Sequence, residues 1–149
     1  MELEKEIKQT TFSSIYHKMA LNILFTAHWI EYRNACFMKP WGITPQQYNI
    51  LRILRGQYPK PASVNLLIDR MLDKMSNASR LVEKLRVKGL VSRHECAEDR
   101  RQVDVLITEH GLSLLKEIDK EMDEQQKFSE MLTEAEAAEL NRLLEKLRG

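Results

Sequence analysis

The segment from residue 73 to residue 111 constrains the fold of this chain more than any other. It contains a helical stretch, then Gly89, a stretch with strand character at 90–95, a charged loop and a second strand stretch. In that second stretch, Val103–Ile107, every second side chain is a branched apolar one, which is the period of a β-strand. The sequence therefore predicts a helix followed directly by a two-stranded hairpin.

On both sides of this unit, apolar residues recur at three- and four-residue steps, which predicts helices there. Asp73 is expected to cap the helix before the hairpin, and Gly89 to end it in a left-handed conformation. Before the hairpin, the expected helices are 4–38, one that begins at Thr44-Pro45 and ends at Gly56, 64–72 with Ser63 as its cap, and 74–88. After the hairpin, one helix is expected to begin after Thr108 and another at the capping box of Thr133 and Glu136.

The helices at 64–72 and 74–88 are joined tightly at Asp73, as in a helix-turn-helix. The second helix would enter the major groove of DNA by its N-terminal end, where polar and basic side chains contact base edges and phosphates. The alternative is an ordinary helical pair, since two amphipathic helices with a short connector occur in many helical domains. The candidate DNA-binding residues on this helix are Lys74, Ser76, Asn77, Ser79, Arg80 and Lys84.

The tip of the hairpin favours DNA over the alternative. It carries Glu98, Asp99, Arg100 and Arg101 in succession. Arginine at such a tip can enter a minor groove, where negative potential is concentrated, and Asp99 is placed to orient Arg101. The other interpretation is a solubilising turn whose exposed ion pair contributes about 0–1 kcal/mol. Because the tip follows a helix-turn-helix, we expect it to contact DNA.

The charge distribution fits a polyanionic partner for the middle of the chain. The formal net charge is only +1. Residues 41–101 nevertheless carry twelve Lys and Arg against six Asp and Glu, whereas residues 116–149 carry six against ten. A neutral protein with a basic middle can hold phosphates locally and keep its acidic part away from them. Ordinary solvated helix faces are the alternative explanation.

Other classes of protein find little support in the sequence. It contains no Ser-His-Asp, paired-carboxylate or phosphate-loop pattern, and His17 and His28 lie roughly 16 Å apart along a helix, too far to share a metal. We therefore expect no enzyme activity, no cofactor and no metal. Cys36 and Cys96 have no disulfide or metal spacing, and the N-terminus lacks the apolar core of a signal peptide. These features predict a soluble, cytoplasmic protein.

Three motifs carry a resemblance to a known family. Asp99-Arg100-Arg101, Ile107-Thr108 and Gly111 match the pattern D-x-R, Leu-Thr, Gly, with Ile in place of the usual Leu. This pattern, the stretch from Ser79-Arg80-Leu81-Val82 to Gly89-Leu90-Val91, and Thr44-Pro45-Gln46-Gln47-Tyr48 resemble the MarR family of bacterial transcriptional regulators. The similarity covers essentially the whole chain in order and length. One departure is Leu72-Asp73-Lys74-Met75, where many members have a Gly-containing turn.

The resemblance implies a mainly α fold in a single domain, 1–149. A winged helix-turn-helix with a two-stranded β wing would occupy 44–110, and dimerisation helices would lie at 1–40 and 112–149. Two such chains would interlock as a homodimer on a palindromic operator and act as a repressor. By the same resemblance, Arg101 would enter the minor groove and Asp99 would hold it.

Many members of that family release DNA when a small, often aromatic or anionic, effector binds between the dimerisation helices and the winged helix. The candidate pocket residues here are His28, Trp29, Tyr32, Arg33, Trp41 and Tyr48. Aromatic surface with a few polar groups suits such a pocket, although core and interface packing is the simpler explanation for any one of them.

Two rival functions stay open. One is a winged helix used for protein contacts without DNA. The other is a regulator that senses oxidants through cysteine. Some relatives do so near the start of the first helix, where this chain has none, whereas Cys96 lies beside His94 and the wing arginines, which could lower its pKa.

Overall fold

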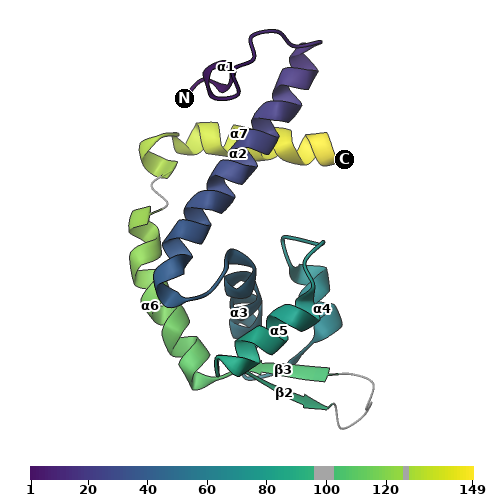
Figure 1. The fold of residues 1–149 in the computed structure, drawn as a ribbon, viewed down its shortest axis with the longest axis vertical. Coiled ribbons are helices and arrows are strands. Elements are labelled where there is room, and N and C mark those ends of the chain that lie inside the picture. Colours follow the sequence, from purple (N-terminus) through teal and green to yellow (C-terminus); the bar gives the residue numbers. More distant parts are fainter. Residues whose placement is uncertain (96–102, 126–127) are drawn as a thin grey trace. The chain divides into compact units, whose positions relative to one another are not determined.

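A computed structural model describes residues 1–95, 103–125 and 128–149 (Figure 1). The chain forms two compact units, Met1–Leu112 and Ser113–Gly149. The described part is mainly helical, with one small antiparallel sheet, so the expected fold class is confirmed.

The N-terminal part of the first unit contains two helices where one was expected. Helix α1 is Leu3–Glu6 and helix α2 is Ile15–Met38, so the prediction of a continuous helix over 4–38 is wrong. The chain leaves the helix through Lys8, which has a φ of 52°. The next helix begins where the Ser14 hydroxyl accepts a hydrogen bond from the His17 N–H at 3.0 Å. An ion pair between Lys18 and Glu4 ties α1 back to α2.

The caps predicted for the next two helices are confirmed. Helix α3, Pro45–Gln57, begins with a capping box in which Thr44 and Gln47 satisfy each other's backbone N–H groups, at 3.2 and 3.1 Å. A short 3-10 turn, Lys39–Trp41, precedes it. Helix α4, Val64–Arg70, is capped by the Ser63 hydroxyl, which accepts from the Leu66 N–H at 3.2 Å.

Helix α5 begins later than the sequence predicts. It runs over Ala78–Val87, and Asn77 is its N-cap, accepting from the Arg80 N–H at 3.0 Å. Asp73 instead closes a local turn, because its carboxylate accepts from the Met75 N–H at 2.9 Å and the Ser76 hydroxyl at 2.6 Å. Asp side chains compete with helix in this way by bonding to nearby backbone groups. The expected helix 74–88 capped by Asp73 is therefore wrong over its first turn.

The hairpin forms as predicted and is joined by a third strand. Strand β2, Val91–Glu95, pairs antiparallel with β3, Val103–Ile107, with Val91 opposite Ile107. Strand β1, Ala62–Ser63, pairs with the other edge of β3, giving the order β1-β3-β2. No strand was predicted at Ala62–Ser63, because two residues are too few to show a period. Gly89, with a φ of 70°, ends α5 as expected.

The core of the first unit lies between the sheet and helices α3, α4 and α5 (Figure 1). Each fully buried aliphatic side chain stabilises the fold by about 1.5–3 kcal/mol relative to an exposed one. Leu72, the last residue of the helix predicted over 64–72, is 89% exposed, because α4 ends at Arg70. The core side chains that are almost completely buried include Ile50, Leu51, Leu54, Leu67, Val82, Leu85, Val105 and Ile107.

The hairpin is followed by helix α6, Glu109–Gln125, whose first turn still belongs to the first unit. Thr108 caps it as predicted, accepting from the Gly111 N–H at 3.1 Å and donating to the Gly89 carbonyl at 2.7 Å. In the second unit a 3-10 turn, Phe128–Glu130, leads to helix α7, Glu134–Arg148. The capping box of Thr133 and Glu136 is also confirmed.

Candidate nucleic-acid interface

Helix α5 has one buried face and one exposed face. Ala78, Val82 and Leu85 fill the core, spaced four and three residues apart. Arg80 and Lys84, one helical turn apart, are exposed on the other side. The sequence thus places two cations on the same outward face of this helix.

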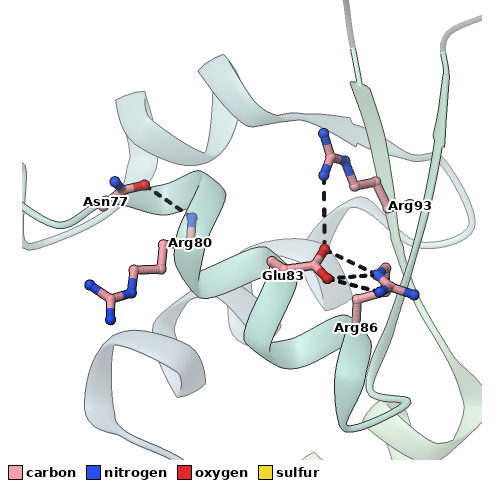
Figure 2. A network of polar contacts seen from close by, with 5 residues as sticks. All are labelled: Asn77, Arg80, Glu83, Arg86 and Arg93. Atoms are coloured by element: carbon pink, nitrogen blue, oxygen red, sulfur yellow. Dashed lines mark hydrogen bonds and ion pairs between the residues drawn. The ribbon is translucent and has the colours of Figure 1, made fainter.

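The polar side chains of α5 fall into two groups. Within the described residues, Ser79, Arg80 and Lys84 have no polar side-chain partner, and Figure 2 shows the Arg80 guanidinium extending away from its neighbours. Glu83 and Arg86 are paired with each other at 2.8 Å. Hence the exposed face keeps its cations available for an external anion, while the adjacent face is neutralised internally.

Glu83 connects the helix to the wing (Figure 2). Its carboxylate accepts two close hydrogen bonds from Arg86, at 2.8 and 3.0 Å, and Nη1 of Arg93 on β2 lies 3.9 Å away. The hydrogen bond from Arg86, helped by the charges of Arg86 and Arg93, lowers the pKa of Glu83. The same hydrogen bond, helped by the negative charge of Glu83, raises the pKa of Arg86. Because the folded-state pKa of Glu83 is lowered, its contribution to stability is present above the ordinary carboxyl pKa and disappears as the pH falls through the lowered value.

Because the Glu83–Arg86 pair is largely exposed, it contributes little to stability, and replacing Glu83 should change DNA affinity more than stability. In a Glu83→Gln variant we expect tighter binding to non-specific duplex and a steeper dependence of log K on log salt, because Arg86 and Arg93 become available to phosphates. Fluorescence anisotropy at several salt concentrations measures both quantities. Glu139→Gln is the matched control, since Glu139 makes the same i,i+3 pair with Arg142 on α7. An unchanged salt slope for Glu83→Gln would contradict this role.

A hollow of about 240 Å³ lies between the start of α4, helix α5 and the two wing strands. It brings Ser79, one of the predicted residues, beside Arg93, which the sequence analysis missed. The signal for Arg93 was its place two residues after the buried Val91, on the same side of the strand. The hollow is lined by Ser63, Asn65, Ser79, Arg93, Val64, Val82 and Val103.

The residues expected on the first turn of the helix lie in the turn that precedes α5. Lys74 extends its ammonium back to the carbonyl oxygens of Ile68, at 3.2 Å, and Asp69, so it closes the end of α4. Ser76 donates to Asp73, and this hydrogen bond is the main reason that the pKa of Asp73 is lowered. Lys74 and Ser76 thus stand apart from the exposed pair Arg80 and Lys84.

The predicted residues of the wing tip, Asp99, Arg100 and Arg101, lie outside the described residues. Their roles stay predictions, as does any role of Cys96. Cys36 is exposed near the end of α2, and a hydrogen bond with it raises the pKa of Tyr32.

The six candidate effector residues lie on α2, on the turn after it and on α3. Trp29 and Arg33 are brought together, with the guanidinium 4.8 Å from the indole centroid. Tyr48 packs under Arg52 on α3, and Trp41 makes an edge contact with Phe37 at 5.0 Å. His28 pairs with Glu31 at 3.3 Å and Tyr32 is 71% exposed. The structure thus brings two of the six candidates, Trp29 and Arg33, into contact.

Among the described residues, no three His, Cys, Asp or Glu side chains gather closely enough to hold a metal ion. None of the helices in the described ranges has the length and apolar character needed to cross a membrane.

The fold and the site define a winged helix-turn-helix protein, because a helix pair has a basic outward face on its second helix and is followed directly by an antiparallel hairpin.

The family model described as the MarR family matches residues 41–102, which cover α3 to the wing. A putative transcriptional regulatory protein for the hcr operon of Thauera aromatica is 31% identical over 107 residues. Those residues are 71% of this chain and 63% of that relative, so the match spans less than two thirds of the relative's length.

Solved structures extend the similarity to nearly the whole chain. A MarR transcription factor from Planctomyces limnophilus is 29% identical with a TM-score of 0.69, covering 91% of this chain and 98% of that one. MepR of S. aureus, solved in complex with DNA, is 21% identical with a TM-score of 0.77, covering 92% and 97%. Residues 41–102 of this chain thus match the MarR family, and the chain as a whole has the fold of these proteins.

Proposed function

We propose that this protein is a transcriptional regulator that binds double-stranded DNA through α5 and the wing. The observation that carries the proposal is the exposed pair Arg80 and Lys84, which have no polar side-chain partner within the described residues. Cations on the outward face of a helix-turn-helix can contact phosphate oxygens and the edges of guanine bases. The complex of the related MepR with DNA supports the same use of this fold.

We propose further that two copies act together on a palindromic operator. Both the first and the last long helix present apolar side chains that a single copy leaves uncovered, and surfaces of this kind mark interaction sites. A two-fold symmetric dimer would match a two-fold symmetric site. The exposed apolar residues are Ile15, Tyr16, Met19, Leu24 and Tyr32 on α2, and Leu140, Leu143 and Leu147 on α7.

The proposed regulatory role is repression that a small aromatic or anionic effector relieves. Trp29 and Arg33 support this choice of effector, because an indole face and a guanidinium next to each other suit an aromatic anion. His28, Tyr32, Trp41 and Tyr48 are the other candidates for this site.

A titration of a labelled duplex from the promoter of the protein's own gene tests DNA binding. The proposal requires tight binding whose log K falls linearly with log salt, because each neutralised phosphate releases counterions. The rival function, a winged helix that contacts only proteins, requires no salt-steep binding to any duplex.

The wing prediction is tested at its tip. Arg101→Ala should weaken operator binding by about 1–3 kcal/mol if this side chain makes a specific groove contact. Lys84→Ala should instead weaken binding to all sequences alike and reduce the salt slope by about one, as loss of a phosphate contact does. Anisotropy titrations of both variants against specific and random duplexes distinguish these patterns. Operator affinity that is unchanged in Arg101→Ala would remove the wing from the interface.

A further inference from the structure

The turn between α4 and α5 displays two large apolar side chains. Leu72 is 89% exposed and Met75 is 93% exposed, the highest value of any large apolar residue in the described part of the chain. Single apolar side chains scattered on a protein surface are common, but these two lie three residues apart in one short turn. Here the backbone is held in place.

Side chains fix this turn at several points. The Leu72 N–H donates to Oδ1 of Asn49 at 3.0 Å, and the Met75 N–H donates to Oδ1 of Asp73 at 2.9 Å. Lys74 closes the end of α4, and Asn77 caps the start of α5. The two apolar side chains therefore stand on an ordered backbone, which reduces the entropy lost when they bind something.

The charge around the turn indicates what that partner is. Arg70, Lys74, Arg80 and Lys84 are all exposed, and they outnumber the acids of the same stretch. The carboxylate of Asp73 is occupied by the turn, and that of Glu83 by Arg86. A polyanion fits this surface better than another protein face of mixed charge. The turn also leads directly into the N-terminal end of α5, the end that reaches base edges in helix-turn-helix proteins.

We propose that Met75, with Leu72 beside it, contacts thymine methyl groups in the major groove and is a specificity-determining residue. The inference rests on the proposed DNA-binding function. Among the groups that base pairs present in the major groove, the C5-methyl of thymine is the apolar one, so it is the partner for an apolar side chain at the base edges. Met75 supplies a flexible, polarizable side chain that adapts to such a group.

The test compares duplexes that differ only in those methyl groups. A random duplex library is enriched with the wild-type protein, and the selected sequence is then made with thymine or with deoxyuridine throughout. We expect the wild-type protein to bind the thymine form about four-fold more tightly or better, the effect of one buried methyl-sized group. In Met75→Ala the ratio should fall towards one while the salt slope is unchanged, and Leu72→Ala should lower it in part. Val87→Ala is the control, since Val87 is 73% exposed at the other end of α5.

Three results would overturn the inference. The first is equal affinity of the wild-type protein for both forms, and the second is a Met75→Ala variant that distinguishes them as the wild type does. The third is a change in the number of chains per particle in Met75→Ala without DNA, measured by analytical ultracentrifugation, which would assign this surface to a second copy. If the library yields no sequence and no duplex binds with a salt-dependent affinity, the proposed function itself fails. Salt-dependent binding with equal affinity for the thymine and the deoxyuridine duplexes would rule out only the thymine contact.

Discussion

Gly111→Ala is expected to lower the free energy of unfolding by about 1–3 kcal/mol, the range for overpacking a well-packed site. A Cβ on Gly111 would lie 2.4 Å from the Leu90 carbonyl oxygen and 2.7 Å from Cγ1 of Ile107. The first of these atoms belongs to the backbone, at the point where α5 ends and the wing begins. It also accepts a hydrogen bond from the Thr108 N–H at 3.1 Å, so relief of the clash would disturb the cap of α6.

Gly56→Ala is the matched control for this substitution. Gly56 lies in helical backbone near the end of α3, and a Cβ at this position would have no neighbouring atom within 4 Å. The same substitution there should stabilise the fold by about 0.4–1 kcal/mol, because alanine reduces the freedom of the unfolded chain. Urea unfolding at one protein concentration measures both variants, since the stability of the proposed dimer would depend on concentration. Equal effects of the two substitutions would contradict the steric argument.

Local chemistry explains which parts of the fold the sequence could predict. The capping boxes at Thr44 and Thr133 and the cap at Thr108 use side chains that bond within three residues, so their pattern is visible in the sequence. The alternation in Val103–Ile107 likewise needs only neighbours in the chain, and the predicted strand has the bounds that the structure gives it. Gly89 ends α5 because a left-handed residue is needed there, and glycine adopts that conformation without strain.

The predictions that failed depended on a choice between similar local signals or on distant contacts. Asp73 and Asn77 are both good caps, and the structure uses Asn77 because the Asp73 carboxylate closes its own turn. The Asn49 side chain also fixes that turn, from a helix 23 residues earlier, a contact that no local pattern contains. The interruption between α1 and α2 has neither Gly nor Pro to mark it. Its signal was the cluster Thr10, Thr11, Ser13 and Ser14, the last of which caps the later helix.

The residues of the candidate interface also divide into those that a local pattern predicts and those that depend on distant contacts. Arg80 and Lys84 were predicted because exposed cations on one side of an amphipathic helix follow from its period. Arg93 was missed, because its approach to Glu83 depends on the wing folding back beside α5. Lys74 was assigned to the helix but serves the end of α4, since the helix starts later than predicted. The position at which α5 begins therefore decides that Lys74 bonds to the end of α4, whereas Arg80 and Lys84 are available to DNA.

Arg80→Ala should cause the largest loss of operator affinity among substitutions of described residues, about 1–3 kcal/mol for a bidentate base contact. The Arg80 side chain leaves the first turn of α5 away from the Glu83 network (Figure 2), and its backbone N–H is held by Asn77. The cap fixes the first turn, so the guanidinium starts from a defined position.

Arg80→Lys separates a base contact from a phosphate contact, because lysine keeps the charge but lacks the planar fork that matches guanine. If Arg80 contacts a base, Arg80→Lys should recover affinity for random duplex but leave operator affinity close to that of Arg80→Ala. If Arg80 contacts only phosphate, lysine should restore binding to both duplexes. Anisotropy titrations at two salt concentrations measure the four affinities. Operator binding by Arg80→Ala at the wild-type level would show that α5 does not carry the specificity of this protein, and the wing would have to supply it.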